Sequence, residues 1–297
     1  TLIPKAQEQL IKGFALASSL ITFVLSAILL FQFDFSSAEK LQLGNKISWI
    51  KSINANYEIG IDGISLPLLV LSTFITVLAI IYSLEHLPEP KSPKGFLALI
   101  LVLETGMNGT FVALDLILFF VFFEIVLLPM YFMIGIWGDK TVRTVSGFKN
   151  QIETRLYASI KFFVFTLFGS AFMLLGFLGL YYRGNKTFSI PELIELGTSG
   201  AFTGTFATLV FAVLFLGFAV KVPMWPLHTW LPDAHTAAPT VGSVLLAAIL
   251  LKLGSYGFVR IAIPILPEQA KAWAPAIAIL SAIGIIYGSL ACLAQTD

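Results

Sequence analysis

Four charged side chains lie inside long apolar runs of this 297-residue sequence, and they are the residues best placed to do chemistry. They are two acids, Glu104 and Glu124, and two bases, Lys221 and Lys252. Each falls within about one helical turn of the middle of its run, the most expensive depth in a bilayer. At about 2.5–3.5 kcal/mol for each unpaired charge, the four would cost on the order of 10–14 kcal/mol. Random drift is a poor explanation of that cost.

Acids and bases at membrane depth have two interpretations. Burial disfavours the charged forms of both groups, and pairing a carboxylate with an ammonium restores them, so such a pair responds to a proton that arrives nearby. That behaviour is the chemistry of a proton relay. The alternative is structural, because two Glu and two Lys residues can also form buried ion pairs that lock the packing of helices.

The sequence around Lys221 predicts a broken helix. Pro223, Pro226 and Pro232 follow the lysine, and proline removes a backbone donor and clashes with the preceding turn. At membrane depth such a break is tolerated where the backbone lines a cavity or is buried in protein. His228 lies on about the same helical face and titrates near neutral pH, which makes it a candidate next proton carrier. Its structural alternative is a helix-end residue hydrogen-bonded to backbone.

The composition of the sequence indicates that these residues are carried by membrane-spanning helices. The sequence is 57% hydrophobic and 12% charged, with a mean hydropathy of +0.90, which excludes a soluble globular protein. It predicts an all-α fold, a polytopic transmembrane helix bundle of eight spans. A tight turn near Asp115 must separate the third and fourth spans, which together would be about twice a bilayer thickness. The predicted spans are Gly13–Phe33, Leu66–Leu84, Gly95–Leu114, Asp115–Trp137, Tyr157–Tyr182, Phe206–Trp230, Thr240–Ile263 and Trp273–Leu293.

Several kinds of site are not expected in this sequence. The net charge of +1 gives no reason to expect a nucleic-acid partner, and the single Cys292 cannot supply a disulfide framework or an iron–sulfur site. The sequence contains no Gly-rich phosphate loop, no dinucleotide fingerprint and no histidine pair spaced for haem. The energy for any ion movement must therefore come from outside this chain.

Longer stretches resemble one family. They are Lys221–His235 (KVPMWPLHTWLPDAH), Ala238-Pro239-Thr240, Gly242–Gly254 (GSVLLAAILLKLG), Leu103–Met107 (LETGM) and Phe123–Gly138 (FEIVLLPMYFMIGIWG). These stretches are similar to the antiporter-like subunits of respiratory complex I, of the chain M type. The resemblance runs from about Asp62 to the end of the chain. It implies an antiporter-like fold with a discontinuous helix and a proton channel in the membrane arm of a proton-pumping NADH:quinone oxidoreductase.

The resemblance also implies roles for individual residues. Glu124 falls on the essential glutamate of the family, Lys221 on the lysine of the broken helix, and Lys252 on the lysine of the following helix. Glu104 matches a further intramembrane glutamate. Glu124 and Lys221 are then expected to pair in one half-channel, and Lys252 to pass the proton onward. His228 is added as an intermediate carrier because of its place on the helical face of Lys221, and not by the resemblance.

The same resemblance predicts organisation and partners. Residues 1–94 are expected to form N-terminal peripheral helices and a loop, 95–263 a five-helix proton-channel repeat, and 264–297 the truncated start of a second, inverted repeat. Because the family continues beyond Gln295-Thr296-Asp297 and has a helix before Gly13, we expect a partial chain. NADH, FMN, iron–sulfur clusters and quinone are expected in partner subunits, with no cofactor or metal in this chain. The expected partners are other complex I membrane-arm subunits, especially neighbouring antiporter-like subunits, and the lipid bilayer of a bacterial cell membrane.

Two alternatives stay open at this point. A subunit of a multi-subunit Na⁺/H⁺ antiporter, or of a membrane-bound hydrogenase, would use the same embedded Glu and Lys residues. A structural membrane spacer would need the charges only for packing. One departure from the family, Ala237 in place of an acidic residue, puts in doubt any role for a carboxylate beside His235.

Overall fold

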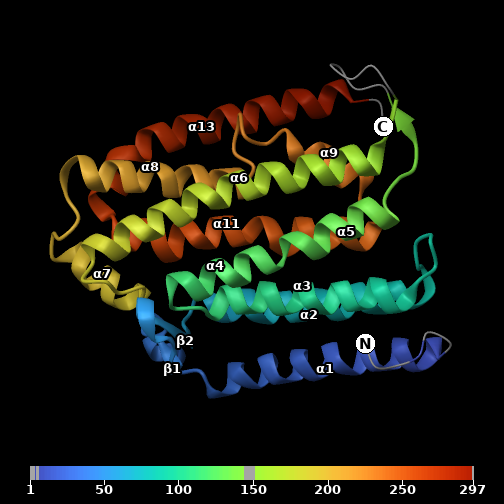
Figure 1. Cartoon of the computed structure of the whole chain (residues 1–297), viewed down its shortest axis with the longest axis horizontal. Coiled ribbons are helices and arrows are strands. Elements are labelled where there is room, and N and C mark those ends of the chain that lie inside the picture. Colours follow the sequence, from blue (N-terminus) through green and yellow to red (C-terminus); the bar gives the residue numbers. More distant parts are fainter. Residues whose placement is uncertain (1–3, 5–6, 144–150, 296–297) are drawn as a thin grey trace.

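The computed structural model describes residue 4 and residues 7–143 and 151–295, so Thr296 and Asp297 lie outside the described residues. Within these ranges, eight spans are long and apolar enough to cross a membrane, which confirms the predicted number. Most of them run roughly alongside one another in a bundle (Figure 1). The spans are Glu8–Gln32 (α1), Ser65–Glu85 (α2), Pro93–Val112 (α3), Leu116–Trp137 (α4, Leu116–Ile125, and α5, Leu127–Trp137), Thr154–Arg183 (α6), Gly204–Lys221 (α8), Thr240–Ile265 and Pro267–Ala294 (α13).

Shorter elements lie within and between these spans. The span Thr240–Ile265 consists of α10 (Thr240–Leu245), the π-helical turn η3 (Leu246–Leu250), α11 (Leu251–Gly257), the π-helical turn η4 (Phe258–Ala262) and α12 (Ile263–Ile265). Two further helices are α7 (Ile190–Thr198) and α9 (Trp230–Ala237). The strands are β1 (Gln42–Ile50), β2 (Ala55–Ile61), β3 (Val142–Arg143) and β4 (Ile152–Glu153). The helical class predicted from composition is confirmed.

The third and fourth spans separate where the sequence predicts a turn. α3 ends at Val112, and the Asp115 carboxylate caps α4 by accepting the backbone N–H groups of Ile117 (2.9 Å) and Leu118 (3.1 Å). Such a cap satisfies donors that have no partner within the helix. Burial raises the pKa of Asp115, and hydrogen bonds from these groups and from the Asn56 backbone N–H oppose that rise.

A β-hairpin connects the first and second spans at one end of the bundle (Figure 1). β1 and β2 pair antiparallel, with Ile50 opposite Ala55 next to the turn. Lys46 on β1 forms ion pairs with Glu58 on β2 (3.2 Å) and with Glu192 on α7 (2.8 Å). The hairpin is therefore attached to α7, an element more than a hundred residues away in the sequence.

The contact between α6 and α8 depends on glycine. A Cβ atom on Gly217 would lie 2.8 Å from the Met173 Cβ, and one on Gly169 would lie 2.8 Å from the Val220 Cβ. These distances are too short for real carbon atoms, so small residues let the two backbones approach closely. Gly169 lies near the middle of α6. The C-terminal end of α8 is therefore held beside the middle of a much longer helix.

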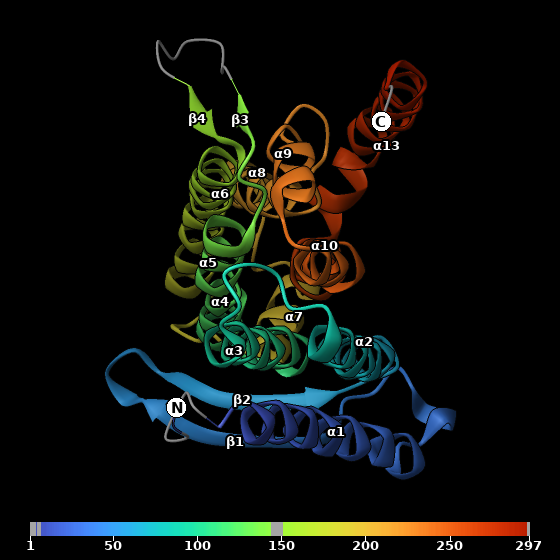
Figure 2. The same cartoon turned by 90° about the vertical axis from the view of Figure 1, so that its right-hand side faces the viewer.

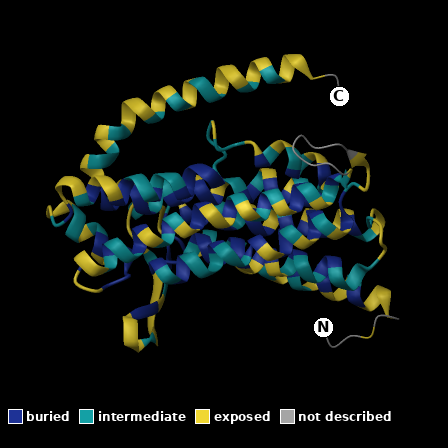
Figure 3. Ribbon diagram, turned by 45° about the horizontal axis from the view of Figure 1, so that its top comes forward, coloured by how far each residue is buried: buried dark blue, intermediate teal, exposed yellow. Residues whose placement is uncertain are grey.

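α13 leaves the bundle (Figure 2), and no residue of it is classed as buried (Figure 3). It contacts α8 near its own beginning, where the Trp273 ring lies 5.5 Å from the rings of Phe211 and Phe215. The helix starts at Pro267 and not at the predicted Trp273, because proline is well tolerated at the first helical position.

Candidate functional site

Lys221 lies at the end of a broken helix in the bundle interior. It is the last residue of α8, and only 3% of it is exposed. Residues 222–229 form irregular turns, so the sixth predicted span, Phe206–Trp230, extends too far. The physical reason is that Pro223 and Pro226 carry no N–H group and their rings clash with a continuing helix. The predicted break is confirmed, and it begins directly after the lysine.

Hydrogen bonds from residues beyond the break replace some of the helical hydrogen bonds that the prolines prevent. The buried Trp230 indole N–H donates to the Val220 carbonyl over 3.0 Å. The Met224 backbone N–H donates to the Ala219 carbonyl over 2.9 Å. Because an unsatisfied buried carbonyl costs about 1–3 kcal/mol, these bonds stabilise the irregular segment in one conformation.

Glu124 on α4 faces the buried lysine. Its carboxylate interacts electrostatically with Lys221, and the Ser170 hydroxyl on α6, which donates to the Leu167 carbonyl (3.0 Å), lies near it. No ion pair within 4.0 Å joins Glu124 to Lys221 in the described part of the chain. Instead, the Lys221 Nζ lies 4.9 Å from the centre of the Phe123 ring, whose face attracts a cation. The structure therefore brings Glu124 and Lys221 close without direct contact.

Lys252 is directed away from this pair. α11 approaches α8 at Gly254, where a Cβ atom would lie 3.0 Å from the Lys221 Cβ. Lys252 lies two residues earlier, about 200° around the helix, and it is exposed. Its Nζ donates to the backbone carbonyl of Ala247 in η3. π-helical turns are rare and occur frequently at functional sites, and this one directly precedes the helix that carries Lys252.

His228 lies within the irregular segment and contacts α13. Its ring is 5.2 Å from the Tyr287 ring in an edge-to-face arrangement. The His228 Nδ1 atom is buried and has no hydrogen-bond partner within residues 7–143 and 151–295. The structural alternative requires a hydrogen bond from the side chain to the backbone, and at Nδ1 the described structure shows no such bond.

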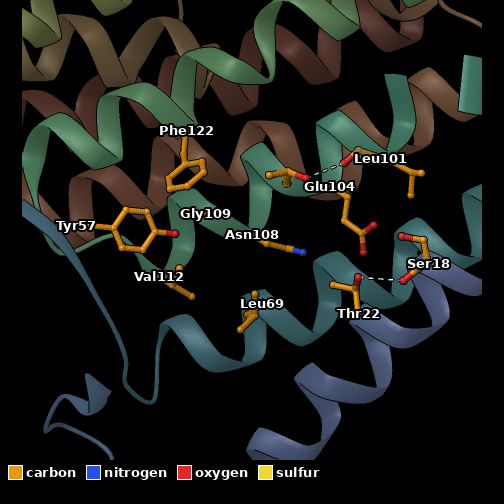
Figure 4. A pocket seen from close by; sticks show the side chains of 11 residues that line it. Ser18, Thr22, Tyr57, Leu69, Leu101, Glu104, Asn108, Gly109, Val112 and Phe122 are labelled. Atoms are coloured by element: carbon orange, nitrogen blue, oxygen red, sulfur yellow. Dashed lines mark hydrogen bonds between the residues drawn. The ribbon is translucent and has the colours of Figure 1, made fainter. Parts of the chain in front are cut away.

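Glu104 lies in a cavity of its own. It is 4% exposed, and its carboxylate extends into a cavity of about 370 Å³ between α1, α2, α3 and α4 (Figure 4). Phe122 on α4 lines this cavity, whereas Glu124, two residues later, faces Lys221. α4 therefore separates Glu104 from the other predicted relay residues.

The prediction of four charges within spans is incomplete. Lys161 lies in the fifth predicted span, and its Nζ forms a 2.8 Å ion pair with Asp233 on α9, with 20% and 18% of the two side chains exposed. Arg260 lies in the seventh predicted span and pairs with Asp62 at 2.7 Å. Both charges stand inside predicted apolar runs, so the sequence contained the signal that identifies them. Their partners are distant in sequence and had no such signal.

Arg260 is part of a hydrogen-bonded cluster that joins three elements. Its Nε donates to the Tyr256 hydroxyl (2.9 Å), which donates to the Phe111 carbonyl on α3 (2.7 Å). Burial would raise the pKa of Asp62, but Arg260 and the Ser65 backbone N–H outweigh this and lower it below the ordinary value of 3.8. The cluster fixes η4 against the start of α2 and the end of α3.

Two models of known protein families match the chain. Residues 113–297, more than half of the chain, match the model of the NADH:quinone oxidoreductase/Mrp antiporter transmembrane family. The chain belongs to this family. Residues 6–110 match a second model, that of the amino terminus of NADH-ubiquinone oxidoreductase chain 4. The broken helix with Lys221 and the helix with Glu124 both lie in the part matched by the first model.

Individual members of the family resemble the chain over nearly all of its length. It is 42% identical over 287 residues to NADH-quinone oxidoreductase subunit M of Rickettsia bellii, covering 95% of the chain and 53% of the relative. It is 42% identical over 301 residues to subunit M of Rhodobacter capsulatus, covering 98% and 55%. The identity to NADH-ubiquinone oxidoreductase chain 4 of Arabidopsis thaliana is 41% over 295 residues, covering 99% and 56%. The chain thus spans about half the length of these relatives.

Solved structures of the family share the fold. A chain of respiratory complex I from Thermus thermophilus with bound NADH matches with a TM-score of 0.81 at 26% identity, covering 96% of this chain and 56% of that one. A chain of the Mrp complex from Dietzia sp. matches with a TM-score of 0.71 at 19% identity, covering 89% and 28%, which shows the fold alone. The resemblance to antiporter-like subunits, read from the broken-helix sequence, is confirmed.

Proposed function

We propose that this member of the family translocates protons as part of a membrane-embedded NADH:quinone oxidoreductase, with Lys221 as the group that takes up and releases the proton. One observation carries the proposal. Lys221 is 3% exposed, ends a helix beside the middle of α6, and faces Glu124 without a direct ion pair. A direct buried pair would hold both charges firmly. A carboxylate beyond 4.0 Å stabilises the ammonium and still lets its proton leave.

The steps follow from the surroundings of the lysine. In the protonated state, the Glu124 carboxylate and the Phe123 ring stabilise the ammonium, and the low dielectric of the interior strengthens both interactions. When a charge elsewhere weakens this attraction, one N–H bond of the Lys221 ammonium breaks, and its proton passes to water in the segment 222–229. Backbone carbonyls freed by the prolines hold that water.

The onward path runs through two further residues. His228 lies in the same irregular segment, and its buried Nδ1 has no partner in the described structure, so this nitrogen is available to accept a proton. Lys252 on the neighbouring helix points away from the pair and is exposed, so its proposed role is that of a later acceptor, reached from His228 through water. Glu104, which the resemblance assigns to the same relay, lies across α4 from this path.

The energy source and partners belong to the same proposal. In this proposal NADH, FMN, iron–sulfur clusters and quinone bind to other subunits, and the neighbours of this chain are antiporter-like subunits. The exposed apolar side chains of α1 and α13 support contact with such subunits or with lipid. The subunit M relatives from Rickettsia and Rhodobacter support a bacterial cell membrane as the location.

A cation/proton antiporter subunit is the second candidate. It is favoured by the family description, which includes the Mrp antiporter, and by the common fold with the Dietzia Mrp complex. The relatives at 41–42% identity are named as NADH-quinone oxidoreductase subunit M and NADH-ubiquinone oxidoreductase chain 4, and this favours the redox-coupled complex.

The test is Lys221→Ala in the intact complex reconstituted into vesicles. We expect a strongly reduced number of protons pumped per electron, because alanine cannot carry the proton. Lys40→Ala, at an exposed loop position, is the matched control and should pump normally. Normal proton-to-electron stoichiometry in Lys221→Ala would exclude the proposed role. Glu124→Gln should behave like Lys221→Ala, and Glu124→Asp should retain part of the coupling if the shorter carboxylate still reaches.

A further inference from the structure

The Glu104 cavity is a second polar centre of the bundle. It has a volume of about 370 Å³, enough for roughly ten water molecules at ~30 Å³ each. Polar groups from three elements line it: the hydroxyls of Ser18 and Thr22 on α1, the carboxylate and amide of Glu104 and Asn108 on α3, and the Tyr57 hydroxyl on β2 (Figure 4). A space of this size, with polar groups on several sides, is suited to a hydrated ligand.

Two buried oxygen atoms at this cavity lack partners. Neither the Glu104 Oε1 atom nor the Asn108 Oδ1 atom has a hydrogen-bond donor in residues 7–143 and 151–295. The two residues are four positions apart on α3, so they lie on the same face one turn from each other. Both atoms are acceptors. Each such buried atom costs about 1–3 kcal/mol if nothing satisfies it, so both atoms favour a positive or hydrogen-donating ligand.

The charge of the site defines the ligand further. No Lys, Arg or His nitrogen lies within 4.0 Å of the Glu104 carboxylate in the part of the chain that the structure describes. A single carboxylate is balanced by one positive charge, whereas a divalent ion would leave a net charge buried at membrane depth. The atoms available as cation ligands are carboxylate, amide and hydroxyl oxygens, which suit hard cations and not soft transition metals. The Thr22 hydroxyl donates to the Ser18 carbonyl (3.0 Å), so its lone pairs remain free to bind a cation.

This centre is separate from the Glu124–Lys221 pair. The Phe122 ring fills the space against Gly109, where a Cβ atom would overlap it, and so lies between the cavity and the far side of α4. Glu124 projects from another face of the same helix toward α6 and α8. The two acids therefore do not share a ligand.

We infer that this cavity binds one monovalent alkali cation, partly hydrated, through the Glu104 carboxylate, the hydroxyls of α1 and the Asn108 amide oxygen, which enters the cavity when the amide group turns from its orientation in Figure 4. The cation joins α1 to α3, because its ligands come from both helices. The inference does not rest on proton translocation by Lys221, since its residues and its readout are different.

The probe is ²²Na⁺ bound at equilibrium to the purified, fully assembled complex in a buffer whose only other cation is N-methylglucamine. We expect Glu104→Gln to bind one Na⁺ fewer per complex, or to bind it at least tenfold more weakly, than the wild type. Asn108→Leu, which keeps the volume and removes the oxygen, should also weaken binding about tenfold. Glu85→Gln, at an exposed position at the end of α2, is the matched control and should bind like the wild type.

Competition and hydrogen exchange give independent outcomes. Displacement of ²²Na⁺ by either Na⁺ or K⁺ supports an alkali-cation site, and their order gives its selectivity. Na⁺ should also slow amide exchange in α1 and α3 of the wild type and not of Glu104→Gln. Equal Na⁺ binding in the wild type and both variants would overturn the inference. A Glu104 carboxyl group that stays protonated, with unchanged surroundings, both with and without Na⁺ would also overturn the inference. If Glu104→Gln fails to assemble, wild-type affinity in Asn108→Leu decides against the inference.

Discussion

Gly257→Ala tests the packing that positions Lys221. Gly257 is the last residue of α11, and a Cβ atom there would overlap the Phe218 ring on α8. Phe218 cannot move away easily, because it is fully buried and its ring packs against those of Phe123 and Phe258 at 6.5 and 5.4 Å. Phe218 also lies three residues before Lys221, on the same face of α8.

The expected magnitude is the difference between two effects. Replacing glycine by alanine in a helix stabilises it by about 0.5–1 kcal/mol, because alanine loses less backbone entropy on folding. Forcing a methyl group into a filled core costs about 1–3 kcal/mol. The net loss of about 1–2 kcal/mol in the free energy of unfolding corresponds to a fall of roughly 2–8 °C in the midpoint of thermal unfolding.

The assay is thermal unfolding of the purified complex, followed together with proton pumping. Gly284→Ala on α13 is the control, because nothing lies within 4 Å of its added Cβ atom, and its midpoint should stay equal or rise slightly. Phe218→Leu combined with Gly257→Ala should cost less than the sum of the two single changes. The reasoning is refuted if Gly257→Ala unfolds at the same temperature as Gly284→Ala. A strictly additive double variant would also refute it.

Three further predictions concern the segment after the break. Trp230→Phe removes the donor to the Val220 carbonyl and should lower the free energy of unfolding by about 1–3 kcal/mol; an unchanged thermal midpoint would mean that another group satisfies this carbonyl. Lys161→Met and Asp233→Asn should each destabilise the contact of α6 with α9, and the double variant should cost less than their sum, whereas additive costs would show that the two side chains are not coupled. Burial lowers the pKa of His235 below 6.5, so its contribution to stability is fully present above pH 6.5 and is lost as the pH falls from there through the folded-state pKa. The protection factors of the α9 amides, in which the pH dependence of intrinsic exchange is divided out, should therefore fall on acidification in the wild type and less in His235→Gln, and equal pH dependence in both would contradict this.

Local chemistry made much of the fold predictable from the sequence. The apolar runs, the turn at Asp115 and the break after Lys221 each depend on residues within a few positions, so the sequence contains their causes. The hairpin was harder to predict because polar residues interrupt the alternation of apolar and polar side chains along its strands. Ile47 and Trp49 on β1 and Tyr57 on β2 nevertheless fit a strand pattern.

The direction in which a side chain points depends on distant contacts, and here the sequence was insufficient. Lys252 and Glu104 lie near the middles of their predicted spans, yet one is exposed and the other enters a separate cavity. The π-helical turn Leu246–Leu250 changes the helical phase just before Lys252, and a periodicity of 3.6 residues does not anticipate it. Likewise, Asp233 is 72 positions from its partner Lys161, so no local pattern connects them.

Because α8 stops inside the bundle, its backbone acts as a fixed counterion. The carbonyl groups at the C-terminus of a helix together carry about half a negative charge, which favours a cation in the last turn. Lys221 is the last residue of that turn. Part of the field that holds its ammonium therefore comes from peptide dipoles that no side-chain neutralisation removes. Glu124→Gln leaves this field in place, whereas Pro223→Ala, which favours continuation of the helix, would carry the negative end away from the lysine.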